Sequence, residues 1–79
     1  MITIKDLLNK IKWDKREAPE QYSIFYFDII LNTLIQIPYT KIKRIEGSFM
    51  VLDSEEETNI PLHRVKKAAK NNAVVWERK

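Results

Sequence analysis

One strand-forming segment with apolar residues on both faces, residues 22–30 (YSIFYFDII), most constrains the fold of this chain. Aromatic and β-branched residues favour a strand, in which alternate side chains point to opposite faces. The even positions are Tyr22, Ile24, Tyr26, Asp28 and Ile30, and the odd positions include Phe25, Phe27 and Ile29. Such a strand is typical of the centre of a sheet that is covered on both sides. A helix can cover one face, and the other then needs a strongly curved sheet or a partner.

The one polar residue well inside this segment, Asp28, stands out on an apolar face. A buried carboxylate without a hydrogen-bond donor is costly. We therefore expect Asp28 to lie near the end of the strand, where it reaches solvent or a backbone N–H.

A helix is predicted over residues 3–12, ending at Trp13. Thr3 is a good N-cap residue, and Asp6 follows three residues later as a variant of the capping box. Four apolar residues recur at the spacing of one helical face: Ile4, Leu7, Leu8 and Ile11. This stripe is the expected cover for one face of the sheet.

Shorter strands are predicted over residues 34–37, 45–52, 58–60, 67–70 and 73–78. Gly47 marks a bulge or a Gly-Ser hairpin turn within the second of these. Asn71-Asn72 joins the last two as a hairpin, because asparagine tolerates a positive φ. The sequence thus predicts a single α+β domain spanning residues 1–79. Its N-terminal helix packs on a strongly curved, mainly antiparallel sheet of about five strands.

The composition argues against several classes of protein. The chain has 79 residues, one histidine and no cysteine. This excludes disulfides and argues against a structural zinc site, so we expect no metal and no cofactor. No apolar run approaches the roughly 20 residues of a membrane helix, and the N-terminus is unlike a signal peptide. We expect a cytoplasmic protein without a membrane span.

The distribution of charge points to a polyanionic partner. Residues 61–79 contain six Lys or Arg residues against Glu77, a formal net charge of +5. A segment this basic suits a nucleic acid. Two alternatives stay open. In the first, the surface is an ordinary solvated one, of the Lys- and Glu-rich kind found in proteins from hot environments. In the second, the basic face docks an acidic protein.

The pair His63-Arg64, placed directly after a proline-bounded strand, is the best candidate site. The arginine side chain offers a planar fork of donors that suits phosphate oxygens, and histidine can donate one more hydrogen bond. Lys66 and Lys67 follow two and three residues after Arg64 and would steer a phosphate backbone. The alternative is structural: His63 caps a turn, and Arg64 pairs with the acidic segment 53–57.

No catalytic constellation is visible in the sequence. The chain has no second histidine to pair with His63 and no Gly-rich phosphate loop. We therefore predict that the domain is not an enzyme. A small phosphoesterase that uses His63 remains the alternative.

The two tryptophans have different expected roles. Trp76 follows Val74-Val75 in a strand and is expected in the core. Trp13, at the end of the helix beside Lys12, is a candidate for stacking on a base or sugar, with helix-to-sheet packing as the alternative.

Several of these residues together resemble a small archaeal family, the RNA cyclic group end recognition domain. The opening matches at Lys12-Trp13-Asp14, and the first strand matches at Tyr26 and Asp28. The closing signature is more specific and comprises Ile60, Pro61, His63, Arg64, Val65 and then Val74, Val75 and Trp76. The resemblance covers essentially the whole chain. Two positions depart from the family pattern: Ile29 stands where a basic residue is common, and Asn72 where a glycine is common.

The resemblance implies an RNA-binding domain of RNA processing or repair. It would recognise RNA 3′ ends that carry a 2′,3′-cyclic phosphate, alongside RNA-processing protein partners. His63 and Arg64 would hold the phosphate, Lys66 and Lys67 would contact the backbone, and Trp13 would stack. Lys12 and Tyr26 complete the predicted set of site residues.

Overall fold

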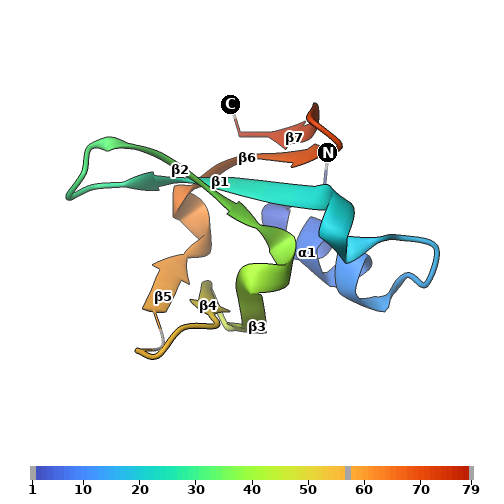
Figure 1. Ribbon diagram of the computed structural model, residues 1–79, viewed down its shortest axis with the longest axis horizontal. Helices are drawn as coiled ribbons and strands as arrows, with labels where there is room; N and C mark the ends of the chain where they lie inside the picture. The colour runs from blue at the N-terminus through green and yellow to red at the C-terminus, as the bar shows by residue number, and fades with distance from the viewer. Residues whose placement is uncertain (1, 57, 79) are drawn as a thin grey trace.

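The chain folds into one helix and two antiparallel sheets. The computed structural model describes residues 2–56 and 58–78, and Figure 1 shows the arrangement. The helix and strands are α1 (Ile4–Trp13), β1 (Tyr22–Asp28), β2 (Thr33–Pro38), β3 (Ile42–Glu46), β4 (Phe49–Leu52), β5 (Thr58–Pro61), β6 (Val65–Lys70) and β7 (Ala73–Glu77). Three short 3-10 turns connect them: η1 (Pro19–Gln21), η2 (Tyr39–Lys41) and η3 (Leu62–Arg64). No helix within the described ranges is long and apolar enough to cross a membrane.

The α+β class is confirmed, but the prediction of one strongly curved sheet of about five strands is wrong. The described strands form a four-stranded sheet in the order β2-β1-β6-β7 and a three-stranded sheet in the order β3-β4-β5, neither strongly curled. Pro38 ends β2, and the turn η2 then leads the chain out of the first sheet. Because proline lacks the N–H that would extend the ladder, the following strands pair among themselves instead.

Two turns explain most of the differences between predicted and observed strands. The predicted strand 45–52 is a hairpin, in which Glu46 pairs with Phe49 and Gly47 adopts a φ of +56°. Of the two roles proposed for Gly47, the structure therefore shows the Gly-Ser turn. The strand predicted to end at Ile30 stops at Asp28, whose carboxylate accepts a hydrogen bond of 3.0 Å from the N–H of Leu31. The expectation for Asp28 is thus confirmed.

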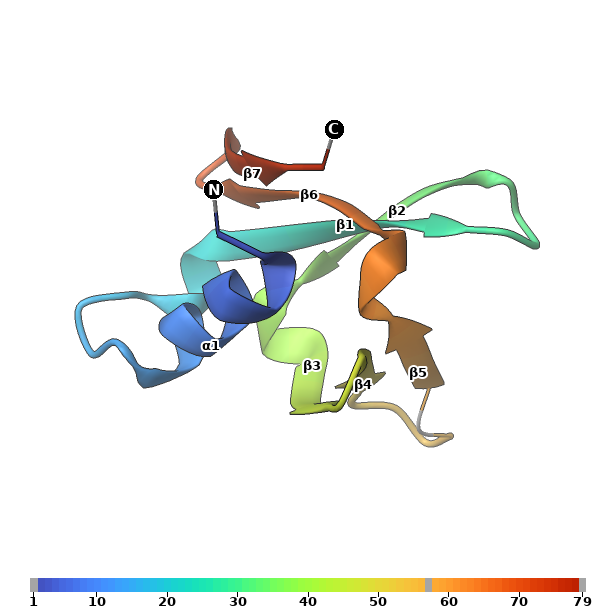
Figure 2. The same ribbon diagram turned by 180° about the vertical axis from the view of Figure 1, so that it is seen from behind.

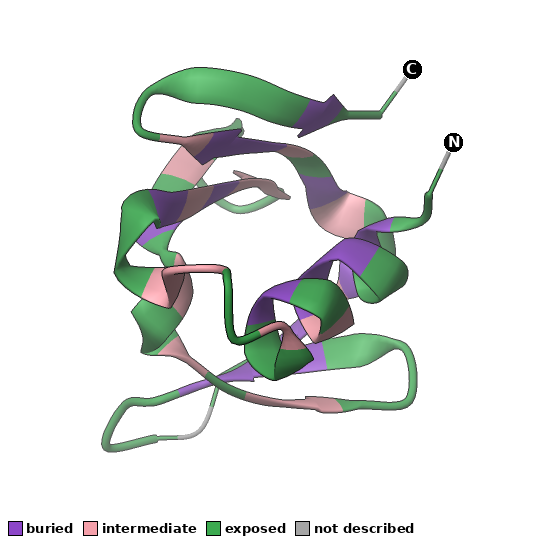
Figure 3. Cartoon of the chain, turned by 90° about the vertical axis from the view of Figure 1, so that its right-hand side faces the viewer, coloured by how far each residue is buried: buried purple, intermediate pink, exposed green. Residues whose placement is uncertain are grey.

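The core lies between α1, the three-stranded sheet and one face of the four-stranded sheet. Figures 1 and 2 show α1 and β3–β5 below β1 in both views, and Figure 3 shows buried segments on the helix and on the strands. The predicted helical stripe is buried in full: Ile4, Leu7, Leu8 and Ile11. Trp76 is also buried, and its Nε1 donates a hydrogen bond of 2.9 Å to the carbonyl of Ile2. Its predicted core position is confirmed.

The opposite side of the four-stranded sheet, which we call the outer face, is not covered by any described element. Strand alternation and the observed pairing place on it Ser23, Phe25 and Phe27 of β1, Leu34, Gln36 and Pro38 of β2, Lys67 and Ala69 of β6, and Val74 and Glu77 of β7. Leu34 is 44% exposed and Val74 is 53% exposed, while both phenylalanines are half-buried. Of the two covers that we expected for the second face of β1, the strongly curved sheet is not found among the described strands, and the partner stays a prediction. Strand β1 is paired on both edges, with β2 and β6, but one face of its sheet is open.

Candidate functional site

A shallow pocket of about 410 Å³ lies where the start of α1 meets the β3–β4 turn and η3. Its lining residues are Thr3, Ile4, Lys5, Gly47, Ser48, Leu62, His63 and Arg78. They come from four segments that are far apart in the sequence. Three of the side chains are basic or can become so: Lys5, His63 and Arg78.

Backbone hydrogen bonds hold the walls of this pocket together. The N–H of Leu62 donates to the carbonyl of Ser48 at 2.8 Å, which ties η3 to the β3–β4 turn. Leu62 and Ile4 are buried in the core beneath the pocket. Because Leu62 is anchored inward, the exposed imidazole of His63 comes next in the chain at the pocket wall.

Of the three basic residues that line the pocket, Arg78 is held by the largest number of hydrogen bonds. Its N–H donates to the carbonyl of Lys66 at 2.8 Å, its Nε to Val65 at 3.0 Å, and its Nη2 to Leu62 at 3.2 Å. Its guanidinium carbon also lies 5.3 Å from the ring centroid of Trp76, within the range of a cation–π interaction. These contacts fix a positive charge beside η3 without neutralising it.

The start of α1 adds a favourable field for an anion. The hydroxyl of Thr3 accepts a hydrogen bond of 3.1 Å from the N–H of Asp6, and its carbonyl accepts one of 3.0 Å from Leu7. The N–H groups of Ile4 and Lys5 precede these and have no intrahelical partner. A helix N-terminus carries a partial positive charge and is a common binding place for phosphate groups. The pocket thus combines a helix terminus with three basic side chains.

Of the predicted pair His63-Arg64, only His63 lines the pocket. Arg64 is half-buried and is absent from the lining. Val65 pairs with Tyr26 as the last pair of the β1–β6 ladder, and Arg64 lies just beyond it as the last residue of η3. Arg64 forms no ion pair with any other residue that the structure describes, the acidic residues 53–56 included. The guanidinium in the pocket belongs to Arg78 instead.

The two predicted lysines of β6 also have different surroundings. Lys67 lies opposite Phe25, and its Nζ is 4.7 Å from the ring centroid. Lys66 is exposed at the point where the β1–β6 register shifts. Both ammonium groups therefore border the outer face or its edge, and neither lines the pocket.

Lys12 and Trp13 are distant from His63. They end α1, whereas Lys5 near its start lines the pocket, and a helix of 10 residues is about 15 Å long. Trp13 is 74% exposed, and the Nζ of Lys12 lies 5.1 Å from its ring centroid. The exposure agrees with a stacking role and rules out the helix-to-sheet packing alternative. This tryptophan cannot share one nucleotide with His63.

Tyr26, the last predicted site residue, points inward. It is half-buried and packs against the core from the covered side of β1. Burial raises the pKa of its hydroxyl, and the nearby charge of Asp28 adds to this effect. Its placement favours packing over contact with a ligand.

Sequence reasoning missed Lys5 and Arg78, and it predicted the Gly47-Ser48 turn without assigning that turn to the site. Neither basic residue has a local motif, since Lys5 is one basic residue on a mixed helix and Arg78 follows the last strand. Only the pairing of β6 with β7 brings Arg78 to η3. Within residues 2–56 and 58–78, no three His, Asp or Glu side chains are grouped closely enough to hold a metal ion.

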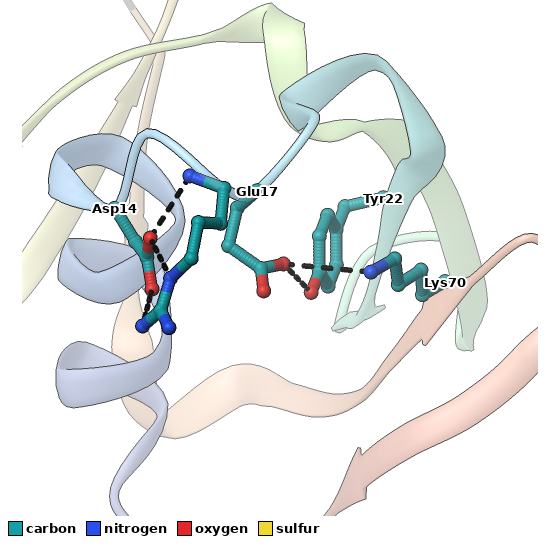
Figure 4. Close-up of polar contacts among 5 residues, drawn as sticks. Asp14, Glu17, Tyr22 and Lys70 are labelled. Carbon is teal, nitrogen blue, oxygen red and sulfur yellow. Dashed lines mark hydrogen bonds and ion pairs between the residues drawn. The ribbon is translucent and has the colours of Figure 1, made fainter.

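A second polar cluster, shown in Figure 4, lies at the other end of α1. The hydroxyl of Tyr22 donates to the carboxylate of Glu17, and the Nζ of Lys70 lies 3.7 Å from the same carboxylate. Burial, followed by the hydrogen bond to Glu17, raises the pKa of Tyr22 to about 12. The Arg16 side chain donates two hydrogen bonds to Asp14 and lowers the pKa of that carboxyl. This cluster ties the loop after α1 to β1 and β6, and its charges are satisfied within the chain.

The fold and the pocket define a small α+β domain with a shallow pocket that is lined in part by basic side chains. Comparison with known proteins identifies its family. The chain belongs to the MJ1316 RNA cyclic group end recognition domain family, which it matches over residues 1–78.

Archaeal relatives align along nearly the full chain. A UPF0248 protein of Saccharolobus islandicus is 38% identical over 78 residues, covering 95% of this chain and 98% of the relative. A UPF0248 protein of Metallosphaera sedula is 38% identical over 77 residues, covering 98% and 94%. One from Saccharolobus solfataricus is 35% identical over 78 residues, covering 95% of each. No solved structure matches the chain significantly. The family resemblance expected from the closing signature is confirmed.

Proposed function

We propose that this domain binds RNA 3′ ends that carry a 2′,3′-cyclic phosphate, as part of cytoplasmic RNA processing or repair. The observation that carries the proposal is the convergence of Lys5, His63 and Arg78 on one shallow pocket at the start of α1. The name of the family, an RNA cyclic group end recognition domain, supports the same ligand.

The pocket suits a singly charged phosphate with two free oxygens. The N–H groups at the start of α1 and the imidazole of His63 offer hydrogen-bond donors, while Arg78 and Lys5 supply positive charge. An open 3′-phosphate carries more negative charge than a cyclic one, so Coulomb attraction alone favours the open form. A domain that prefers the cyclic phosphate must therefore distinguish it from the open 3′-phosphate by shape and by the placement of hydrogen-bond donors. Fixed groups such as Arg78 are better suited to this than mobile lysines.

The proposal is for binding without turnover. Hydrolysis of a cyclic phosphate by acid–base catalysis calls for a proton donor and a proton acceptor. The lining that the structure describes contributes one histidine, His63, and no carboxylate. Arg64, Lys66 and Lys67 lie outside the pocket and would contact phosphates further from the end.

The test compares one oligonucleotide that ends in a 2′,3′-cyclic phosphate, a 3′-phosphate or a 3′-hydroxyl. We expect the cyclic form to bind about tenfold more tightly than either of the others, a difference of about 1.4 kcal/mol. His63→Ala and Lys5→Ala should each remove most of this preference. Lys15→Ala, an exposed substitution in the loop after α1, is the matched control and should leave the preference intact.

Three results would count against the proposal. One is an affinity that rises with the charge of the phosphate, which indicates a generic polyanion binder. Another is a preference for the cyclic form that persists in both His63→Ala and Lys5→Ala, which would show that the RNA end binds outside the pocket. The third is release of an opened product that His63→Ala abolishes, which identifies a phosphoesterase.

A further inference from the structure

The outer face of the four-stranded sheet carries aromatic and aliphatic side chains, which are not typical of a surface that contacts only solvent. Phe25 and Phe27 lie on the same side of β1, two residues apart, and therefore roughly 7 Å apart along the strand. Leu34, exposed at 44%, lies beside Phe27 on β2. Two aromatic rings at the middle of an uncovered sheet face are unusual, because aromatic side chains contribute most when they are buried.

Positive charge borders these rings. The Nζ of Lys67 lies 4.7 Å from the centroid of the Phe25 ring. Lys66 lies at the register shift opposite Phe25 and Tyr26, and Arg64 lies just beyond the last pair of the same ladder, Tyr26 with Val65. None of these three basic side chains forms an ion pair with another residue in the described parts of the chain. Apolar ring surface flanked by unneutralised cations matches a base and its phosphate, and it matches an apolar protein surface less well.

The turn η3 connects the end of the β1–β6 ladder to the pocket. Tyr26 pairs with Val65, and Phe27 and Arg64 are their respective neighbours at the end of the ladder. His63, which lines the pocket, directly precedes Arg64. A strand of RNA whose end lies at His63 can therefore continue past Arg64 and onto the outer face.

We infer that the outer face is a stacking platform for unpaired nucleotides, with one base on Phe27 and the next on Phe25. Bases that stack on side chains must be unstacked from their own neighbours, so the ligand is single-stranded RNA. For a base to lie on Phe25, the flexible Lys67 side chain moves off the ring, and its ammonium group then reaches the phosphate beside that base. The order of the bases rests on the proposed end pocket, whereas the stacking itself does not.

The test uses single strands of two and eight nucleotides with the same 2′,3′-cyclic phosphate end. Phe25→Leu and Phe27→Leu keep apolar bulk on the face and remove the rings. Stacking of a base on an aromatic side chain typically changes affinity by about 5- to 150-fold. We therefore expect the double variant to weaken binding of the eight-nucleotide strand by at least about tenfold. Leu34→Ala, on the same face without a ring, should change it less than about threefold.

A second measurement uses the unaltered protein, so it does not depend on how the variants fold. The fluorescent base 2-aminopurine is placed in turn at each position of the eight-nucleotide strand. Quenching by stacking should be strongest in the first few positions from the 3′ end and absent at the 5′ end. A fully base-paired duplex of the same sequence should bind with no dependence on Phe25 or Phe27.

The outcomes separate this inference from the proposed function. If the eight-nucleotide strand binds the double variant as tightly as the unaltered protein and no position is quenched, the platform is wrong, whatever the end preference. If end preference is absent but binding still depends on both rings, the platform stands and the end pocket is wrong. Loss of self-association in the double variant, with RNA binding unchanged, would show instead that the face joins two copies of the chain.

Discussion

Each face of the four-stranded sheet carries a lysine whose ammonium group lies over an aromatic ring. Only the lysine on the covered face also lies close to a carboxylate. On the covered face, the Nζ of Lys70 lies 5.6 Å from the ring centroid of Tyr22. On the outer face, the Nζ of Lys67 lies 4.7 Å from the ring centroid of Phe25. Glu17 accepts a hydrogen bond from the hydroxyl of Tyr22, and its carboxylate lies 3.7 Å from the Nζ of Lys70, so the inner group is complete within the chain. Glu77 lies opposite Lys67 on β7, but no carboxylate among the described residues forms an ion pair with Lys67.

Under the proposed function, this difference separates residues that stabilise the fold from residues that contact RNA. A cation over a ring that also meets a carboxylate has its charge satisfied by the fold. A cation over a ring without a carboxylate keeps its charge for a ligand. The covered face should therefore respond to substitution through the free energy of unfolding, and the outer face through RNA affinity.

The largest effect is expected from truncation inside the core. Leu8→Ala should lower the free energy of unfolding by about 2–5 kcal/mol, because Leu8 is fully buried between α1 and the sheet. The matched change on the outer face, Leu34→Ala, should cost less than about 1 kcal/mol. Denaturant titration of both variants gives the comparison. Equal costs would mean that the outer face is packed after all.

The two tryptophans allow a second comparison. Trp76→Phe should cost about 1–3 kcal/mol, since it removes buried ring area and the hydrogen bond to the carbonyl of Ile2. Trp13→Phe should be close to neutral, because that side chain is 74% exposed. Iodide should quench the fluorescence of Trp13 and leave that of Trp76 largely unaffected. A buried Trp13 in this assay would undermine its candidacy as a stacking residue.

The salt dependence of RNA binding tests the cations beside the outer face. Each phosphate contact on a single strand contributes about −0.7 to the slope of log affinity against log salt concentration. The double substitution Lys66→Ala with Lys67→Ala should therefore make the slope shallower by about 1.4. The control pair Lys10→Ala with Lys15→Ala removes the same charge from exposed positions elsewhere. A slope that both pairs change equally would show that net charge, and not this surface, governs binding.

The smallest effect concerns Tyr22 and appears only at alkaline pH. Burial and the hydrogen bond to Glu17 raise the pKa of its hydroxyl to about 12, above its ordinary value near 10. A raised pKa in the folded state stabilises the fold below pH 10, and this contribution is lost as the pH rises toward about 12. The free energy of unfolding should thus fall across that interval. In Tyr22→Phe the decline should be weaker, and an unchanged decline would assign it to other groups.

Local sequence patterns were enough to predict several parts of this molecule. Helix α1 follows from the spacing of Ile4, Leu7, Leu8 and Ile11, and its cap from Thr3. The last hairpin follows from Asn71-Asn72, which both adopt a positive φ. The same patterns predicted the core position of Trp76 and the placement of Asp28 at a strand end. In each case the information lies within a few residues, where backbone geometry and side-chain spacing act directly.

The tertiary structure alone decided how these parts meet. Both faces of the strand 22–30 are apolar, and nothing in its sequence says which face the single helix will cover. The division into two sheets depends on long-range pairing after Pro38, and the pocket depends on Lys5 and Arg78, which are 73 positions apart in the chain. Contacts between such distant segments depend on the packing of the whole core. Local sequence therefore predicted the elements and His63, whereas packing decided which basic residues join it and which face of the sheet stays open.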